Sequence, residues 1–179
     1  FWQYDFYRYN RRDRGFSTTS IHGIDTIRYL AGKDYQHIDF HYYPNPQNSA
    51  LVPTITLDCE FVDGAHGRIT FVPASGISAE RCTMHGTNEM IYAALPYHGV
   101  NGSMDGPGSI IVTQMNEIIL REEAQDEAFF ISNGFYDENA HFFDCIRKGI
   151  RPIDDIASGL QAVEIADCIR SRKNSYDTG

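Results

Sequence analysis

The sequence predicts an α+β fold, in which an open and mainly antiparallel β-sheet carries helices packed on one face. Residues 35–120 alternate apolar and polar side chains and show no sustained helical period. Short turns rich in glycine, proline and asparagine separate the alternating segments, so consecutive strands should run antiparallel. One helix-like segment precedes this region and two follow it, which is typical of a sheet with its helices on one side.

Eight segments are expected to be strands. The first is the aromatic-rich stretch at residues 1–9, which leads into a charged loop. The other seven lie in the alternating region, at residues 37–43, 54–62, 67–72, 79–86, 90–95, 109–114 and 116–122. The sequence DGAHG between the second and third of these seven has the composition of a hairpin turn.

The first expected helix runs from Ser17 to Gly32. Ser17 or Thr18 can cap its first N–H groups, and Gly32 marks its end. Its apolar side is expected to consist of Ile21, Ile24, Ile27 and Leu30.

Two more helices are expected near the C-terminal end of the sequence. The segment 136–148 should pack Phe142, Phe143 and Ile146 against the rest of the domain and end at Gly149. The segment 154–173 has acidic residues early and basic residues late, as the helix dipole favours. Its apolar stripe is expected to be Ile156, Leu160, Val163, Ala166 and Ile169.

Composition narrows the class of protein. The 179 residues suit a single α+β domain spanning 1–179, and a net charge of −9 argues against a nucleic-acid partner. No apolar run approaches the length of a membrane span and no signal peptide is evident, so we expect no membrane partner and a cytoplasmic location. Four widely spaced cysteines without a C-x-x-C pair predict reduced thiols and no metal site.

The first helix carries a polar stripe, formed by Thr18, His22, Asp25 and Tyr29. At about 100° per residue these side chains fall on one face, opposite the apolar side. A solvated helix face is one interpretation, although such a face is usually rich in lysine and glutamate. The other is a functional face, because histidine can move protons and a nearby carboxylate can fix its tautomer.

Three parts of the sequence together resemble the C-terminal domain of the Gfo/Idh/MocA oxidoreductases. They are GFSTTSIHGIDTIRYLAG near the start, TMHGTNE in the strand region, and HFFDCIRKGIRPIDDIASGLQAVEIADCIRS near the end. The resemblance implies a partner Rossmann domain that binds NAD or NADP, and hydride transfer to or from a sugar or polyol. It also implies that His22 is the catalytic proton shuttle, with Asp25 as its companion on the same helix.

Two features depart from the pattern of that family. The family often has an aspartate four residues before the histidine, where this chain has Thr18, which cannot act as a base near neutral pH. The N-terminal Rossmann domain is absent from this sequence, and the glycine-rich stretch 99–108 contains no G-x-G-x-x-G turn to replace it. Because the chain begins with Phe1 and not methionine, we expect it to be part of a longer protein, and inactive by itself.

Thr18 and Asp25 are expected to orient the substrate beside His22, and further side chains are candidates for substrate binding. Arg12 lies just before the polar helix and could grip hydroxyl or carboxylate groups, while His85 and Tyr97 could form the rim of a pocket. An open antiparallel sheet with one uncovered face is also expected to mediate homo-oligomer formation. The alternative function is a non-catalytic sugar-binding or assembly module that keeps the same fold.

Overall fold

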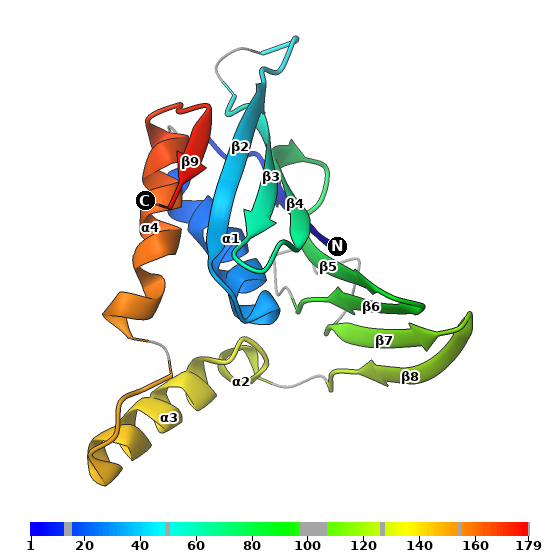
Figure 1. Cartoon of the computed structure of the whole chain (residues 1–179), viewed down its shortest axis with the longest axis vertical. Helices are drawn as coiled ribbons and strands as arrows, with labels where there is room; N and C mark the ends of the chain where they lie inside the picture. Colours follow the sequence, from blue (N-terminus) through cyan, green and yellow to red (C-terminus); the bar gives the residue numbers. More distant parts are fainter. Residues whose placement is uncertain (13–15, 49–50, 97–106, 126–127, 154, 179) are drawn as a thin grey trace.

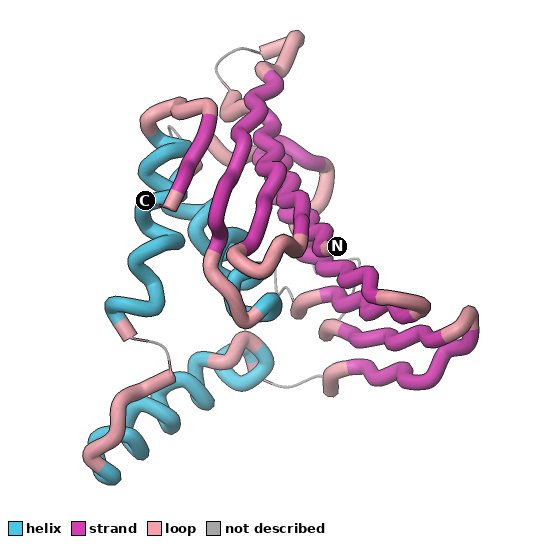
Figure 2. Tube along the Cα trace, in the orientation of Figure 1, coloured by secondary structure: helices cyan, strands magenta, loops and turns pink. Residues whose placement is uncertain are grey.

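A nine-stranded sheet with helices against one part of it forms the body of the computed structural model (Figure 1, Figure 2). The structure describes residues 1–12, 16–48, 51–96, 107–125, 128–153 and 155–178. The strands are β1 (Trp2–Tyr9), β2 (Tyr35–Tyr43), β3 (Thr54–Phe61), β4 (His66–Ser75), β5 (Ala79–Gly86), β6 (Glu89–Ala94), β7 (Ser109–Gln114), β8 (Glu117–Glu123) and β9 (Ser175–Asp177). The helices are α1 (Ser17–Ala31), α2 (Phe129–Ser132), α3 (Phe135–Lys148) and α4 (Ile156–Arg170).

The expected fold class and all eight expected strands are confirmed. The strand order is β8-β7-β6-β5-β1-β4-β3-β2-β9, and every neighbouring pair in it is antiparallel except β1 and β4. The parallel pair arises because β1 enters the middle of the sheet, between two strands that come later in the sequence. The short edge strand β9 and the four-residue helix α2 were not expected from the sequence.

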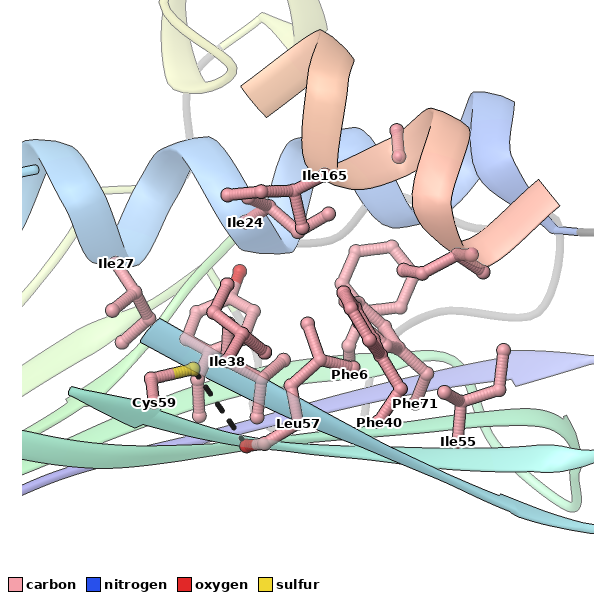
Figure 3. Packing of buried hydrophobic residues seen from close by; sticks show 14 of the residues in the cluster. Phe6, Ile24, Ile27, Ile38, Phe40, Ile55, Leu57, Cys59, Phe71 and Ile165 are labelled. Carbon is pink, nitrogen blue, oxygen red and sulfur yellow. Dashed lines mark hydrogen bonds between the residues drawn. The ribbon is translucent and has the colours of Figure 1, made fainter. Parts of the chain in front are cut away.

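The core lies between the sheet and the helices α1 and α4, which pack against each other (Figure 3). Ile24 of α1 and Ile165 of α4 meet above Leu57 and Ile38 of the sheet. Three fully buried aromatic side chains, Phe6, Phe16 and Phe71, pack edge to face, with ring centroids 5.5 to 6.1 Å apart. Aromatic burial of this kind dominates the stability of small domains.

The N-terminal cap of α1 differs from the expectation. The cap position is Phe16, which has a positive φ of 55° and makes no side-chain cap hydrogen bond. The ring of Phe16 is fully buried among the core aromatics, and this burial offsets the cost of the unusual backbone. The C-terminal cap at Gly32 is as expected, with a left-handed backbone.

The predicted packing of the two C-terminal helices is wrong in part. Phe142, Phe143 and Ile146 of α3 are exposed, and so are Leu30 of α1 and the first three residues of the predicted stripe of α4. Helix α4 buries the face formed by Ala162, Ile165, Ala166, Cys168 and Ile169, so Ala166 and Ile169 of the predicted stripe are buried as expected. Since α4 also carries apolar residues on its outer side, its sequence period could not show which face packs inward.

Within the described residues, no helix is both long and apolar enough to cross a membrane.

Candidate functional site

Helix α1 presents its polar stripe to solvent because its other side packs closely on the sheet. At Gly23, an added Cβ would lie 2.8 Å from Cε1 of Phe71 and 3.1 Å from Cε1 of Tyr4. Glycine therefore allows the helix backbone to approach these two buried rings. Thr18, His22 and Tyr29 of the stripe are exposed on the far side.

The imidazole of His22 is exposed and accepts or donates no hydrogen bond among the described side chains. Its backbone carbonyl oxygen accepts a hydrogen bond of 2.7 Å from the Thr26 hydroxyl, which is an internal bond of the helix. The ring lies on the second turn of α1, where both nitrogens can reach a bound molecule. A neutral imidazole in this position can accept a proton at one nitrogen.

The predicted companion of His22 has another partner. Oδ1 of Asp25 lies 3.5 Å from Nε of Arg28, and these two buried atoms make no hydrogen bond. The Arg28 guanidinium also donates to Asp34, at 2.8 Å, and to the carbonyl oxygen of Ser158 in α4. Asp25 therefore belongs to a charged group that joins α1 to α4, and the structure shows no bond from its carboxylate to His22.

Thr18 and Arg12 lie at the N-terminal end of α1. The Thr18 hydroxyl is not used as a cap, and its side chain is exposed one turn before His22. Arg12 is exposed as well, and its Nε donates a 3.2 Å hydrogen bond to Oδ1 of Asn10. Both side chains could therefore bind hydroxyl groups of a ligand that approaches this end of the helix.

The structure does not bring His85 to the stripe. Met84 and Cys82 of β5 pair with Trp2 and Tyr4, and Tyr4 faces α1. Since side chains alternate along a strand, His85 is on the opposite face of the sheet, where it is exposed. Tyr97, the other expected rim residue, lies outside the described residues.

A charged group beneath α1 was missed in the sequence. The buried Tyr4 hydroxyl donates to Glu80, whose carboxylate also pairs with Arg8. The Arg8 guanidinium carbon lies 3.6 Å from the centroid of the Phe6 ring, a cation–π arrangement. Burial, followed by the Glu80 charge, raises the pKa of Tyr4 well above its usual value. The alternation of Tyr4, Phe6 and Arg8 along β1 is the signal that places them on one face.

One hollow in the described part of the chain lies away from the stripe. It has a volume of about 660 Å³ and lies between α4 and β9. Its lining includes Glu164, Asp167, Cys168, Lys173, Tyr176 and Asp177, and no residue of the polar stripe. The polar stripe therefore lies outside this hollow. Among the described residues, no cluster of histidine, cysteine, aspartate or glutamate is placed to hold a metal ion. His37 and His41 each lie close to a carboxylate, at 2.7 Å from Asp177 and 3.2 Å from Asp58.

Solved structures of several oxidoreductases share this arrangement of strands and helices. A dehydrogenase (MviM) from Clostridium difficile matches with a TM-score of 0.75 and 16% identity, over 96% of this chain and 54% of that chain. A Gfo/Idh/MocA family oxidoreductase from Vibrio cholerae matches with a TM-score of 0.71 and 15% identity, over 96% and 51%. The chain has the fold of the C-terminal part of Gfo/Idh/MocA oxidoreductases.

A third match extends the comparison to a structure with bound molecules. Levoglucosan dehydrogenase, in complex with NADH and levoglucosan, matches the Gfo/Idh/MocA-like fold of this chain with a TM-score of 0.70 and 14% identity, over 99% of this chain and 58% of that one. The chain thus spans about half the length of the solved structures it matches. No protein-family model matches the sequence, and no curated protein matches it either.

Proposed function

We propose that this chain is the substrate-binding half of an NAD(P)-dependent oxidoreductase that acts on a sugar, a polyol or a related hydroxy compound. The observation that carries the proposal is the exposed ring of His22, which has no partner in the described chain and stands on α1 of a Gfo/Idh/MocA-like fold. The solved structure with NADH and levoglucosan supports the same class of reaction. In this proposal residues 1–179 form one domain, and the protein is cytoplasmic.

His22 has the proton-transfer role in this proposal. When the substrate hydroxyl becomes a carbonyl, its carbon loses a hydride and its oxygen loses a proton, and a ring nitrogen of His22 accepts that proton. Thr18 is one turn away and can hydrogen-bond a neighbouring hydroxyl, while Arg12 can hold a more distant oxygen. Asp25 contributes indirectly, through the contact with Arg28 that fixes α1 against α4.

The residues present do not fit a nicotinamide nucleotide. The sequence has no G-x-G-x-x-G turn, and the stretch 99–106 lies outside the described residues. A nucleotide-binding half beyond this sequence would hold NAD or NADP, which accepts the hydride when bound. This chain alone should therefore not catalyse the reaction.

The free face of the sheet supports a second part of the proposal, a homo-oligomer. Asp5 and Tyr7 alternate with the helix-facing residues of β1, so they lie on the face away from α1, as does Tyr92 of β6. These side chains are half-buried, and burial raises the pKa of both Asp5 and Tyr7. Light scattering at rising protein concentration tests this, and a monomer at all concentrations would contradict it.

Substrate screening tests the proposed function. The protein expressed from its whole coding sequence should form NADH or NADPH when supplied with the oxidised cofactor and one member of a panel of sugars and polyols. The rate should saturate with substrate concentration. A protein that binds no member of the panel and reduces neither cofactor would contradict the proposal.

A non-catalytic sugar-binding or assembly module is the second candidate. The observation that favours it is that no acidic side chain of the described residues contacts His22, because Asp25 contacts Arg28 and position 18 is a threonine. Calorimetric titration with the same panel separates the two functions. Saturable sugar binding without turnover, in the presence of both cofactors, would favour the binding module.

A further inference from the structure

Helix α4 is apolar on two sides. Its inner side is buried against α1 and the sheet, through Ala162, Ile165 and Ala166 among others. Its outer side exposes Ile156 by 95%, Leu160 by 54% and Val163 by 53%. These three residues are spaced four and three positions apart, so they form one stripe. A helix that is apolar on both sides is typical of a position between two layers of structure.

Helix α3 also exposes apolar side chains. It packs mainly against the short helix α2 and projects away from the sheet (Figure 1). Phe142, Phe143 and Ile146 are exposed, and the two phenyl rings lie 5.9 Å apart. Cys145 is the one described residue of α3 that is buried. A 14-residue helix with so little burial needs a tertiary partner, because its own hydrogen bonds stabilise it only marginally in water.

We propose that these two outer stripes, Phe142, Phe143 and Ile146 on α3 and Ile156, Leu160 and Val163 on α4, are the docking surface for the nucleotide-binding half of the same protein. This inference rests on the proposed function. The matched structures are about twice as long as this chain, so roughly half of each has no counterpart here. That half is large enough to cover both stripes.

A second copy of the chain is the less favoured occupant. The sheet already offers another copy its free face, on the side away from α1. The stripes belong to helices, and α4 packs with α1, so its outer stripe lies on the layer that carries His22. A nucleotide-binding half seated there would lie on the same side of the sheet as the proton-transfer residue, as hydride transfer requires.

Side-chain footprinting with hydroxyl radicals tests the proposal. The modification rates of Phe142, Phe143 and Leu160 are compared between the 179-residue chain and the protein expressed from its whole coding sequence. Because these side chains are about half exposed in the chain, burial at an interface core should lower their rates by about fivefold. Val62, which is 56% exposed in the turn after β3, should be modified at the same rate in both.

Two substitutions add a matched comparison. Val163→Asn and Val62→Asn replace the same residue at nearly the same exposure. Both variants of the 179-residue chain should unfold at similar denaturant concentrations. In the whole protein, Val163→Asn alone should raise the labelling of Phe142 and Leu160 towards the values of the isolated chain.

Three results would overturn the proposal. The first is equal labelling of the stripes in the chain and the whole protein, even if that protein oxidises a sugar. The second is protection that already appears in the chain and grows with its concentration, which would identify a second copy as the occupant. The third is a whole coding sequence without a nucleotide-binding half. Protected stripes in a protein without turnover would instead support the docking surface and contradict the proposed function.

Discussion

The close approach of α1 to the sheet predicts opposite effects for one substitution at two sites. Gly23 and Gly159 both lie within helices, and alanine is favoured over glycine in a helix by about 1 kcal/mol. At Gly159 an added Cβ would meet no atom within 4 Å, so Gly159→Ala should stabilise the chain. At Gly23 the same methyl group would lie 2.8 Å from the Phe71 ring.

The Phe71 ring cannot move aside easily. It is fully buried, and its centroid lies 5.5 Å from that of Phe6 and 5.7 Å from that of Phe16. Overpacking of a tight core costs about 1–3 kcal/mol, which equals or exceeds the helical gain. Gly23→Ala should therefore lower the free energy of unfolding or at best leave it unchanged. Since the helical term is common to both variants, their difference should be about 1–3 kcal/mol.

Urea unfolding of the 179-residue chain, followed by circular dichroism, measures both variants against the parent. The reasoning predicts a higher midpoint for Gly159→Ala and a lower one for Gly23→Ala, with similar slopes. Equal stabilisation by both substitutions would refute the argument, because it would show that the contact of α1 with Phe71 and Tyr4 is loose.

Three further predictions concern charged groups. Arg28→Met should lower the free energy of unfolding by about 1.5–3 kcal/mol in urea titrations, because it removes the charge-assisted hydrogen bonds to Asp34 and Ser158. An unchanged midpoint would show that these bonds do not stabilise the packing of α1 on α4. The hydrogen bond to Asp177 raises the pKa of His37. The wild-type chain should therefore have a higher free energy of unfolding than His37→Gln below about pH 6.5, and this advantage should disappear as the pH rises through the raised pKa. A difference that stays constant with pH would contradict this. Asp155 caps α4, and the pairing with Arg151 lowers the pKa of Asp155 to about 2. The wild-type chain should therefore unfold at a higher temperature than Asp155→Asn above about pH 4, and this advantage should disappear as the pH falls through about 2. A difference in unfolding temperature that does not change with pH would contradict this.

The sequence predicted the strands well because one face of each strand is buried, which leaves a clear alternation. Strand β3 is the clearest case, with Ile55, Leu57, Cys59 and Phe61 buried and the residues between them half-exposed. The pairing of β1 with β4 could not be predicted, since it joins segments about 65 residues apart and depends on how the whole sheet closes. The three-residue strand β9 is too short to show a period.

The C-terminal helices show the limit of periodicity. Ile156, Leu160 and Val163 have a helical spacing as regular as that of the buried face of α4. Only the small residues Ala162 and Ala166, which allow α4 to approach α1 closely, distinguish the inner side. The exposure of Phe142 and Phe143 could not be inferred either, because a pattern shows that a face is apolar but not what covers it.

The sequence predicted which side of α1 is polar, but not the contacts of Asp25. The exposure of Thr18, His22 and Tyr29 follows from the helical period. The partner of Asp25 did not follow, because His22 and Arg28 are both three residues away from it on the same helix. Arg28 lies beside Asp25 because its guanidinium is held in place by hydrogen bonds to Asp34 and to the carbonyl oxygen of Ser158.

The most direct measurement of the central claim is the turnover number of the whole protein carrying His22→Gln, with the sugar or polyol that the parent oxidises. Loss of a general base predicts a decrease of about 10²- to 10⁴-fold in kcat, with a much smaller change in KM. His66→Gln, at an exposed histidine in the β3–β4 hairpin, serves as the control and should keep parental turnover. Near-parental turnover of His22→Gln would contradict the role of His22 and the account of the site built on it.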